Sequence, residues 1–261
     1  MKHWYLGTIG FSYKDWVGPF YPAGTTQRGY LPYYSKVFNA VELDTTFHSI
    51  PQQSTVQSWF TSTPEEFRIC LKTPRRITHE LGLKGTQRLM LEFIDSLQPL
   101  GEKQGPILIQ LPPKFSQVYY SVLNEFLESL PKTHQFAIEF RHASWYNQKT
   151  TQLLNQHQVS WVANDFPNLP KEINLTANFV YIRWIGVNSL YQHHTHERVD
   201  RSIELRWWLE QIYHVSELVR NVYGFFNNDY AGFAVGTGKR FKLIAGLTDQ
   251  EDNLPYQSRF I

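Results

Sequence analysis

The chain has 261 residues, 42% hydrophobic and 18% charged, so it can bury the core of one large α/β domain or two small ones. Its net charge of +2 excludes a surface that binds polyanions as a whole, and any contact with nucleic acid would depend on a local patch. The single cysteine excludes an internal disulfide framework and a cysteine-based zinc site.

The amino-terminal sequence MKHWYLGTIGFS has no long apolar run before a small-residue cleavage site. No segment approaches the roughly 18 apolar residues that span a bilayer. These features predict a cytoplasmic protein that does not enter a membrane, and they leave its oligomeric state open. Aromatic residues make up 16% of the chain, and such rings fill large cores or stack on sugars and bases.

In the amino-terminal half, strand-like and helix-like stretches alternate in chain order. Strands are predicted at residues 4–10, 40–44, 67–72 and 107–111, and helices at 28–38, 54–61, 87–97 and 119–130. The second strand, AVELD, carries Glu42 and Asp44 on one face, and the third ends in a basic loop that begins at Lys72.

The stretch 136–145, FAIEFRHASW, is predicted to be a buried strand whose carboxyl end opens into a site. Because successive side chains alternate, Glu139 and Arg141 share one side, and Ile138 and Phe140 share the other. Ser144 is predicted to be a helix N-cap. Further strands are expected at residues 159–164, 179–184 and 222–227, with helices at 147–157, 203–219 and from about 231.

This pattern of about eight strand–helix alternations has no composition break and no linker. It predicts a single domain over residues 1–261 that folds as a closed (β/α)₈ TIM barrel with a parallel eight-stranded core. A doubly wound open sheet is the alternative, but no glycine-rich dinucleotide fingerprint follows the first strand.

In such barrels the working residues gather at the carboxyl ends of the strands. Here those ends supply acids, bases and amides: Glu42, Asp44, Lys72, Gln110, Glu139, Arg141, Asn164, Asp165, Arg183, Asn227 and Asn228. One interpretation is a structural ring of ion pairs that closes the top of the barrel. The other is a polar pocket for a small anionic or polyhydroxylated ligand.

In the pocket interpretation, Glu139 and Glu42 are the candidate catalytic acid and base. Arg141 and Arg183 suit a bidentate hold on phosphate or carboxylate, and Lys72 adds a third positive charge. The second and fifth strands are well separated around a barrel, so the distance between the two carboxylates stays open.

Histidines raise the question of a metal. The run HHTHE, with His193, His194 and His196, lies in mid-loop without helical spacing, which is more typical of a solvated loop. Three histidines that follow strand ends give another candidate for a divalent metal with Glu42 or Glu139: His48, His79 and His142. The prediction is no cofactor, with a divalent metal as the alternative.

Several stretches resemble the YecE-like family, domain of unknown function 72. They are YLGTIGFSYKDWVGPFYP, FNAVELDTTFHSIP, FRICLKTP, GPILIQLPPKF, FAIEFRHASW, FVYIRW and VYGFFNND, in family order over nearly the whole chain. The resemblance implies a TIM-type barrel near the xylose-isomerase-like and endonuclease-IV-like barrels. It places the family's recurrent polar positions on Glu42, Lys72, Gln110, Glu139, Arg141, His142, Arg183, Asn227 and Asn228.

The chain also departs from the family pattern at three positions. Asp44 stands where asparagine is usual, and His48 where tyrosine is usual. Ile185 stands where the family often has histidine, which removes one potential ligand or acid–base group.

The function predicted from these features is a hydrolase or lyase that acts on a phosphate- or sugar-containing substrate. The alternative is a non-catalytic nucleic-acid-binding protein, in which aromatic loops stack on bases and the cluster Lys72, Arg75 and Arg76 contacts phosphates.

Overall fold

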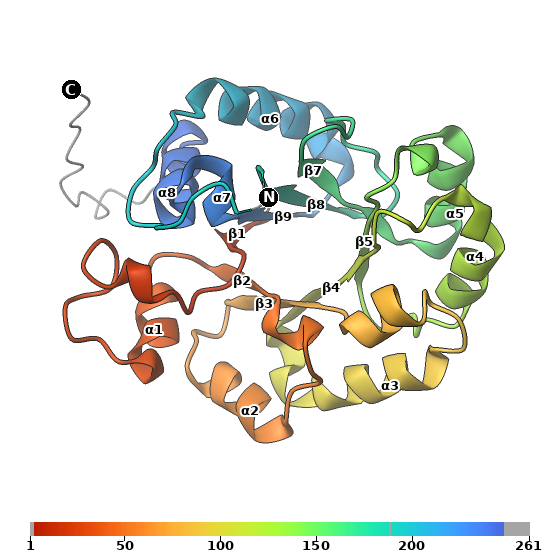
Figure 1. The fold of residues 1–261 in the computed structure, drawn as a ribbon, viewed down its shortest axis with the longest axis horizontal. Helices are drawn as coiled ribbons and strands as arrows, with labels where there is room; N and C mark the ends of the chain where they lie inside the picture. The colour runs from red at the N-terminus through yellow and green to blue at the C-terminus, as the bar shows by residue number, and fades with distance from the viewer. Residues whose placement is uncertain (1–2, 188, 248–261) are drawn as a thin grey trace.

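A computed structural model describes residues 3–187 and 189–247 of the chain. Figure 1 shows strands at the centre and helices around them. The strands are β1 (His3–Thr8), β2 (Ala40–Leu43), β3 (Arg68–Lys72), β4 (Gln104–Gln110), β5 (Phe136–Glu139), β6 (Ser160–Trp161), β7 (Ala163–Asp165), β8 (Phe179–Trp184) and β9 (Asn221–Phe226).

The helices follow the strands along the chain. They are α1 (Gln27–Tyr34), α2 (Gln53–Thr61), α3 (Gln87–Ser96), α4 (Tyr120–Glu128), α5 (Gln148–His157), α6 (Ser202–Val215), α7 (Asn228–Ala231) and α8 (Ala234–Ile244). Short 3₁₀ turns lie at Lys14–Trp16, Thr45–Phe47, Gln98–Lys103, Gln117–Tyr119, Ala143–Trp145 and Ser216–Leu218, and a π-helical turn at Arg76–Glu80. None of the helices described is long and apolar enough to cross a membrane.

The strands form two parallel sheets, not one closed sheet. One sheet has the order β1-β9-β8-β7 and the other the order β2-β3-β4-β5-β6. The α/β class with parallel strands is therefore confirmed, but the predicted closed eight-stranded TIM barrel is wrong.

The first break in the hydrogen-bonded ladder lies between β1 and β2, where side chains take the place of strand partners. The Leu6 amide donates to Asn39 Oδ1 (2.9 Å), and the Thr8 amide donates to the Tyr34 hydroxyl (2.7 Å), which itself donates to the Ala40 carbonyl (3.1 Å). Only an isolated bridge, between Ile9 and Glu42, joins the backbones beyond this point. Polar side chains thus satisfy backbone groups that a continuous ladder would use.

The second break lies in residues 159–164, which were predicted as one strand. The chain forms β6 beside β5 and then β7 beside β8, with Val162 between the two short strands. The Val162 amide donates to the Ile138 carbonyl (2.9 Å), so this residue still contacts the sheet that the chain is leaving. Two short strands therefore replace the predicted single strand.

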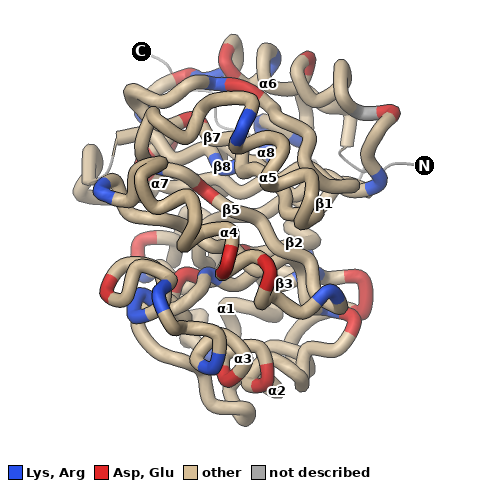
Figure 2. The backbone as a smooth tube through the Cα atoms, turned by 90° about the vertical axis from the view of Figure 1, so that its right-hand side faces the viewer, with Lys and Arg blue, Asp and Glu red and all other residues tan. Residues whose placement is uncertain are grey.

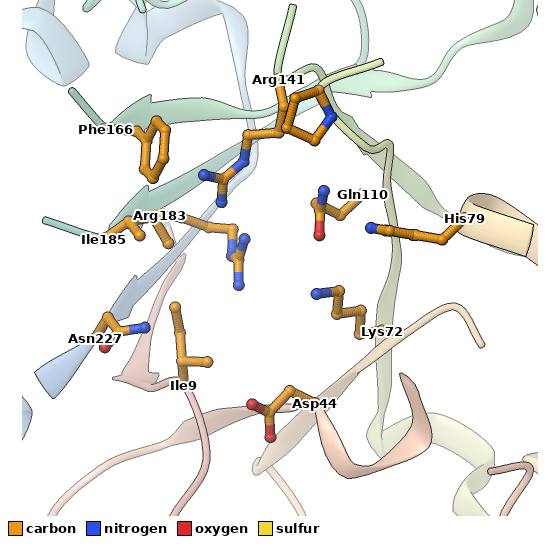
Figure 3. A pocket seen from close by; sticks show the side chains of 11 residues that line it. Ile9, Asp44, Lys72, His79, Gln110, Arg141, Phe166, Arg183, Ile185 and Asn227 are labelled. Atoms are coloured by element: carbon orange, nitrogen blue, oxygen red, sulfur yellow. The ribbon is translucent and has the colours of Figure 1, made fainter. Parts of the chain in front are cut away.

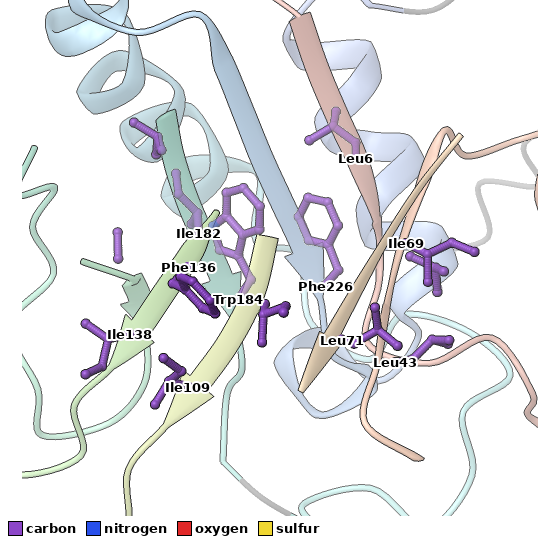
Figure 4. Close-up of a cluster of buried hydrophobic side chains, with 14 of the residues drawn as sticks. Leu6, Leu43, Ile69, Leu71, Ile109, Phe136, Ile138, Ile182, Trp184 and Phe226 are labelled. Atoms are coloured by element: carbon purple, nitrogen blue, oxygen red, sulfur yellow. The ribbon is translucent and has the colours of Figure 1, made fainter. Parts of the chain in front are cut away.

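Alternation along the strands separates two hydrophobic clusters. The larger cluster joins strand residues to the helices, and Figure 4 shows several of its strand side chains, among them Ile138, Ile182 and Trp184. The smaller cluster is an inner core made by strand residues and their immediate neighbours: Ile9, Ala40, Cys70, Leu108, Ala137, Val162, Phe179, Tyr181, Ile185, Tyr223 and Phe225. The predicted placement of Ile138 and Phe140 on one side of the strand is confirmed, because both belong to the larger cluster.

On most strands a polar residue stands two positions after a residue of the inner core, and this spacing keeps both side chains on the same face. Each stands two positions after an inner-core residue: Glu42, Lys72, Gln110, Glu139, Asn164, Arg183 and Asn227. Because the strands are parallel, the period of two places these side chains at one end of the inner core.

The predicted N-cap at Ser144 is wrong. Ser144 lies inside the turn Ala143–Trp145, and its hydroxyl accepts from the Gln117 amide (2.9 Å). Helix α5 begins at Gln148, and its N-cap is Asn147, whose side chain accepts from the Thr150 amide (3.2 Å).

Candidate functional site

Arg183, near the carboxyl end of β8, is the centre of a buried ion network. Its Nε and Nη2 donate to the two oxygens of Glu42 (3.0 and 2.8 Å), and its Nη1 donates to Glu139 Oε2. The Tyr181 hydroxyl donates to Glu42 Oε2 (2.7 Å). Both carboxylates are fully buried, so the structure brings Glu42 and Glu139 together on one guanidinium.

The network keeps Glu139 and Arg183 ionised in spite of their burial. Burial alone would raise the pKa of Glu139, but Arg141 and Arg183 lower it to about 2. Burial would likewise lower the pKa of Arg183, but Glu139 and Glu42 raise it above its usual value. All three nitrogens of Arg183 donate to these two carboxylates, and such pairing is what makes its burial tolerable.

Above this network lies a cavity of about 330 Å³, shown in Figure 3. Its lining combines polar and charged groups with a few apolar walls: Ile9, Asp44, Lys72, His79, Gln110, Pro113, Arg141, Phe166, Arg183, Ile185 and Asn227. The cavity therefore collects the ends of strands that lie far apart in the sequence. Its volume is in the range of a small-molecule site.

Lys72 ends β3 and faces the cavity. Its Nζ lies 4.0 Å from the centre of the Phe47 ring, a cation–π contact, and it forms no ion pair with any residue that the structure describes. Burial and the positive charge of Arg183 lower the pKa of Lys72 to about 8, although Glu139 and other acids oppose the shift. A substantial neutral fraction is therefore present at mildly alkaline pH.

Arg141 follows β5 and covers one side of the cavity. Its Nε donates to Glu139 Oε1, and its guanidinium stacks on Phe166 at 3.9 Å from the ring centre. Within the described residues, its two terminal Nη groups have no hydrogen-bond partner. Arg141 is thus oriented by one carboxylate and one ring and keeps donors for a ligand.

His79 lies in the π-helical turn after β3, and its Nδ1 is 2.8 Å from the Thr78 hydroxyl. Its ring makes an edge contact with Phe47. Burial, with the positive charge of Lys72 next in size, lowers the pKa of His79 to about 4. The imidazole is therefore neutral at physiological pH, and it can donate or accept a hydrogen bond without adding charge to the cavity.

Asp44 lies across the opening from Arg141 (Figure 3). It directly follows β2, and its carboxylate has no hydrogen bond or ion pair with another described residue. The cavity therefore has the Arg141 guanidinium on one side and, on the other, a carboxylate without an ion pair to any described residue.

The amide residues of the predicted site have different surroundings. Gln110 Nε2 donates to the Leu111 carbonyl, which leaves Oε1 for the cavity. Asn227 lines the cavity and caps α7 by accepting from the Asp229 amide (2.9 Å). Asn164 is buried, and neither of its side-chain amide atoms has a hydrogen-bond partner within the described structure.

Two predicted substrate-binding residues are not in the cavity lining. Asn228 is buried and accepts from the Ala234 amide (3.0 Å) at the start of α8. His142 Nδ1 bonds the Ser144 hydroxyl (2.8 Å) and amide in the turn after β5. Both residues hold local backbone here, and their predicted contact with substrate stays a prediction.

Sequence reasoning missed three lining residues, Ile9, Pro113 and Phe166. Phe166 directly follows the strand residues Asn164 and Asp165, so the rule that sites gather at strand ends could have included it. Its stacking on Arg141 is a tertiary contact that no local pattern indicates. Asp165, which was on the same strand-end list, instead accepts from Trp208 Nε1 (2.9 Å).

The histidine-rich loop assembles no recognisable metal centre within the described residues. His193 Nδ1 lies 3.7 Å from Asp15 Oδ2, and the His194 amide donates to the same oxygen (3.2 Å). His194 Nε2 is 3.9 Å from Asp229 Oδ1. These contacts attach the loop to the turn before α1 and to α7.

The residues proposed for nucleic-acid binding do not form one exposed surface. Lys72 lines the cavity, while Arg75 is exposed and lies 3.6 Å from Glu80. The loop aromatics Trp16 and Tyr21 are fully buried and so cannot stack on bases. Figure 2 shows acidic and basic residues interspersed along the backbone.

Comparison with known proteins adds the family relationship. A family model described as "Protein of unknown function DUF72" matches residues 5–258. The UPF0759 protein YecE of Escherichia coli (strain K12) is 29% identical over 213 residues, which cover 72% of this chain and 76% of that protein.

Two crystal structures of DUF72 family proteins are also similar. The one from Thermotoga maritima has 30% sequence identity and a TM-score of 0.80, and the match covers 94% of this chain and 99% of that chain. The one from Enterococcus faecalis has 23% identity and a TM-score of 0.78, covering 95% and 99%, and it supports the fold alone.

Proposed function

The chain belongs to the DUF72 family, and we propose that its cavity binds a small anionic, polyhydroxylated substrate and converts it as a hydrolase or lyase. The observation that supports this most is the pairing of unused cationic donors with an unused carboxylate across one cavity of about 330 Å³. A cavity with convergent polar groups and perturbed pKa values is the usual form of an active site.

Arg141 is the proposed anion contact. The sequence pointed equally to Arg183, but that guanidinium already donates to Glu42 and Glu139 with all three of its nitrogens. Arg141 donates to Glu139 only through its Nε, so its terminal nitrogens can donate to a phosphate or carboxylate oxygen. Lys72 adds a second positive charge to the same cavity.

Hydroxyl groups of the substrate would meet acceptors elsewhere in the lining. The Asp44 carboxylate and Gln110 Oε1 are acceptors that face the cavity, and Asn227 adds an amide beside them. Ile9 and Ile185 supply the apolar wall against which a carbon skeleton can lie.

Lys72 is the proposed proton-transferring group. A general acid or base works best when its pKa is close to the working pH, and the pKa of about 8 at Lys72 meets that condition. The pKa of Glu139, at about 2, lies far below it. We therefore assign Glu42 and Glu139 a positioning role through Arg183 and Arg141, which revises the acid–base role predicted for them.

Thermal unfolding in phosphate and in chloride at equal ionic strength tests the anion site. A ligand that binds only the folded state adds about 2.7 kcal/mol at one hundred times its dissociation constant. We expect the melting temperature to rise further in phosphate than in chloride, and Arg141→Met to remove that difference.

Arg88→Met is the matched control, because Arg88 is exposed and its contact is a surface pair with Glu92 at 2.9 Å. It should leave the phosphate effect unchanged. Coincident phosphate and chloride curves in the parent protein would refute the anion site. Assay of sugar phosphates and glycosides then separates an enzyme from a binder, since a binder would show the phosphate effect without turnover.

A further inference from the structure

We infer that Lys72 is a nucleophile that forms a covalent imine with the carbonyl group of a small ligand held by Arg141, an inference that rests on the proposed anion site. The ligand class is a short aldehyde or ketone that carries a phosphate or carboxylate and hydroxyl groups. The cavity of about 330 Å³ limits it to a small molecule.

The position of the Lys72 amine is the first argument. Nζ faces the cavity at the end of β3, with a ring on one side and no hydrogen-bond acceptor among the described residues. An amine in such a position is accessible to a ligand carbonyl and does not have to break an ion pair before it reacts. The contact with Phe47 limits where the amine can point.

Lys103 shows what a buried structural lysine looks like in the same chain. Lys103 is buried, and burial lowers its pKa as it does for the half-buried Lys72, but its Nζ donates to the carbonyls of Phe60 and Thr63, both at 2.6 Å. Those bonds occupy its protons and keep it away from the cavity. Both lysines have a pKa lowered by desolvation, and an amine that faces a cavity without an ion pair to a described residue distinguishes Lys72.

The charges around Lys72 favour the neutral amine that attack requires. Arg183 from β8 opposes the ammonium form, while Glu139 from β5 and Glu42 and Asp44 from the β2 region favour it. The balance with burial puts the pKa near 8. A lysine that is desolvated next to another cation is a known way to obtain an amine nucleophile.

The covalent step balances without another reactant. The lone pair of neutral Nζ attacks the carbonyl carbon, the carbon–oxygen π pair moves to oxygen, and one proton passes from the nitrogen to that oxygen to give a neutral carbinolamine. The nitrogen lone pair then forms the carbon–nitrogen double bond as the hydroxyl takes up one proton, equal to the one released when the ammonium became the neutral amine, and leaves as water. The sum is ammonium plus carbonyl going to iminium plus water, with no redox change.

The iminium would act as an electron sink for cleavage of an adjacent carbon–carbon or carbon–hydrogen bond, which is lyase chemistry. Asp44 and Gln110 lie in the same lining and offer acceptors for a hydroxyl next to the carbonyl. The inference therefore selects the lyase branch of the proposed function and a carbonyl-bearing substrate.

Reductive trapping tests the inference. The protein is incubated with dihydroxyacetone phosphate and sodium borohydride, which reduces an iminium to a stable secondary amine, and the modified residue is located by peptide mass spectrometry. We expect one adduct, on Lys72, with a yield that rises as the pH increases through about 8. Unphosphorylated dihydroxyacetone should give about tenfold less, since it lacks the charge-assisted bond to the arginine.

Three variants complete the test. Lys72→Met should lose the adduct, and Lys103→Met, the matched control, should keep it. Arg141→Met should reduce the yield with the phosphorylated probe to that of the unphosphorylated one. Inorganic phosphate should compete with the phosphorylated probe for Arg141 and so lower the adduct yield in the parent protein.

The outcomes separate this inference from the function on which it rests. Phosphate stabilisation without an adduct on Lys72, or adducts spread over exposed lysines such as Lys36, would overturn the imine and leave the anion site standing. An adduct on Lys72 whose yield changes neither with added phosphate nor in Arg141→Met would overturn the inference that Arg141 holds the ligand. Absence of both the adduct and the phosphate effect would overturn both proposals.

Discussion

Replacing Glu139 by glutamine tests whether the buried ion network stabilises the fold. The substitution keeps the side-chain volume and removes one negative charge from a residue that is fully buried. Arg141 would then lose its ionised partner, and Arg183 would lose one of its two, keeping Glu42. The amide nitrogen of the new glutamine would also place a hydrogen-bond donor against one of these arginines. A buried charge that loses its partner costs about 3–5 kcal/mol.

The pKa of Glu139 gives a second estimate of the free energy that this carboxylate contributes to folding. Its fall from 4.5 to about 2 on folding makes the ionised form about 3 kcal/mol more favourable in the folded state than in the unfolded chain. Because the folded pKa is the lower one, this stabilisation is complete above the unfolded pKa of 4.5 and is lost as the pH falls through about 2. It falls to about 1.4 kcal/mol at pH 3.

Urea and thermal unfolding of parent and variant at pH 7 and pH 3 measure these differences. At pH 7 the variant should melt roughly 6–12 °C lower, since about 1 kcal/mol shifts the melting temperature by 2–4 °C in a chain of this size. At pH 3 the gap should roughly halve. Glu92→Gln is the control, because its exposed pair with Arg88 contributes less than about 1 kcal/mol. A Glu139→Gln variant that melts with the parent at both pH values would refute the reasoning.

Three more predictions concern groups around the cavity. Gly186→Ala should unfold more easily than Gly18→Ala in thermal melts: both glycines have positive φ, at 74° and 99°, but only at Gly186 would a methyl group overlap the Asp229 backbone. Tyr181→Phe should cost about 1.5–3 kcal/mol in urea unfolding, because its hydroxyl donates to a buried carboxylate, and an unchanged midpoint would contradict this. The His79 imidazole should titrate by NMR with a midpoint near 4, whereas a midpoint near 6.5 would show that burial and its cationic neighbours do not act on it.

The strands and the facing of their side chains could be predicted from the sequence, because both depend on local periodicity. Glu139 and Arg141 were placed on one side and Ile138 and Phe140 on the other, and the inner and outer clusters follow that division. The period of two acts residue by residue, so it needs no knowledge of strand partners.

The division into two sheets could not be predicted in this way. It depends on the Asn39 and Tyr34 side chains, which bond the amides of β1 where β2 would otherwise pair. A polar side chain and a neighbouring strand compete for the same backbone groups, and the sequence shows only that both are present. The same is true at Val162, where the chain changes from one sheet to the other within a stretch that reads as one strand.

The membership of the candidate site was largely predictable, but the use of each charge was not. The pattern suggested three cations and three acids at strand ends, and either an ion-pair ring or a ligand pocket. The structure shows the ion-pair interpretation around Arg183, and the ligand pocket stays a prediction. Arg183 binds Glu42 and Glu139 as a buried pairing, while Lys72 and Asp44 remain without ion pairs within the residues described.

The separation of Arg141 from Lys72 across the cavity bears on whether both can act on one ligand (Figure 3). An anion next to Lys72 would favour its ammonium form and raise its pKa, which reduces the neutral amine needed for attack. An anion held at Arg141 leaves a larger distance to the amine, and Coulomb interactions weaken with distance. The ion pair with Glu139 and the stack on Phe166 fix Arg141 on that side. If the proposed anion site is at Arg141, the buried network would thus also determine how far the anion lies from Lys72, and so how much neutral amine remains once a ligand is bound.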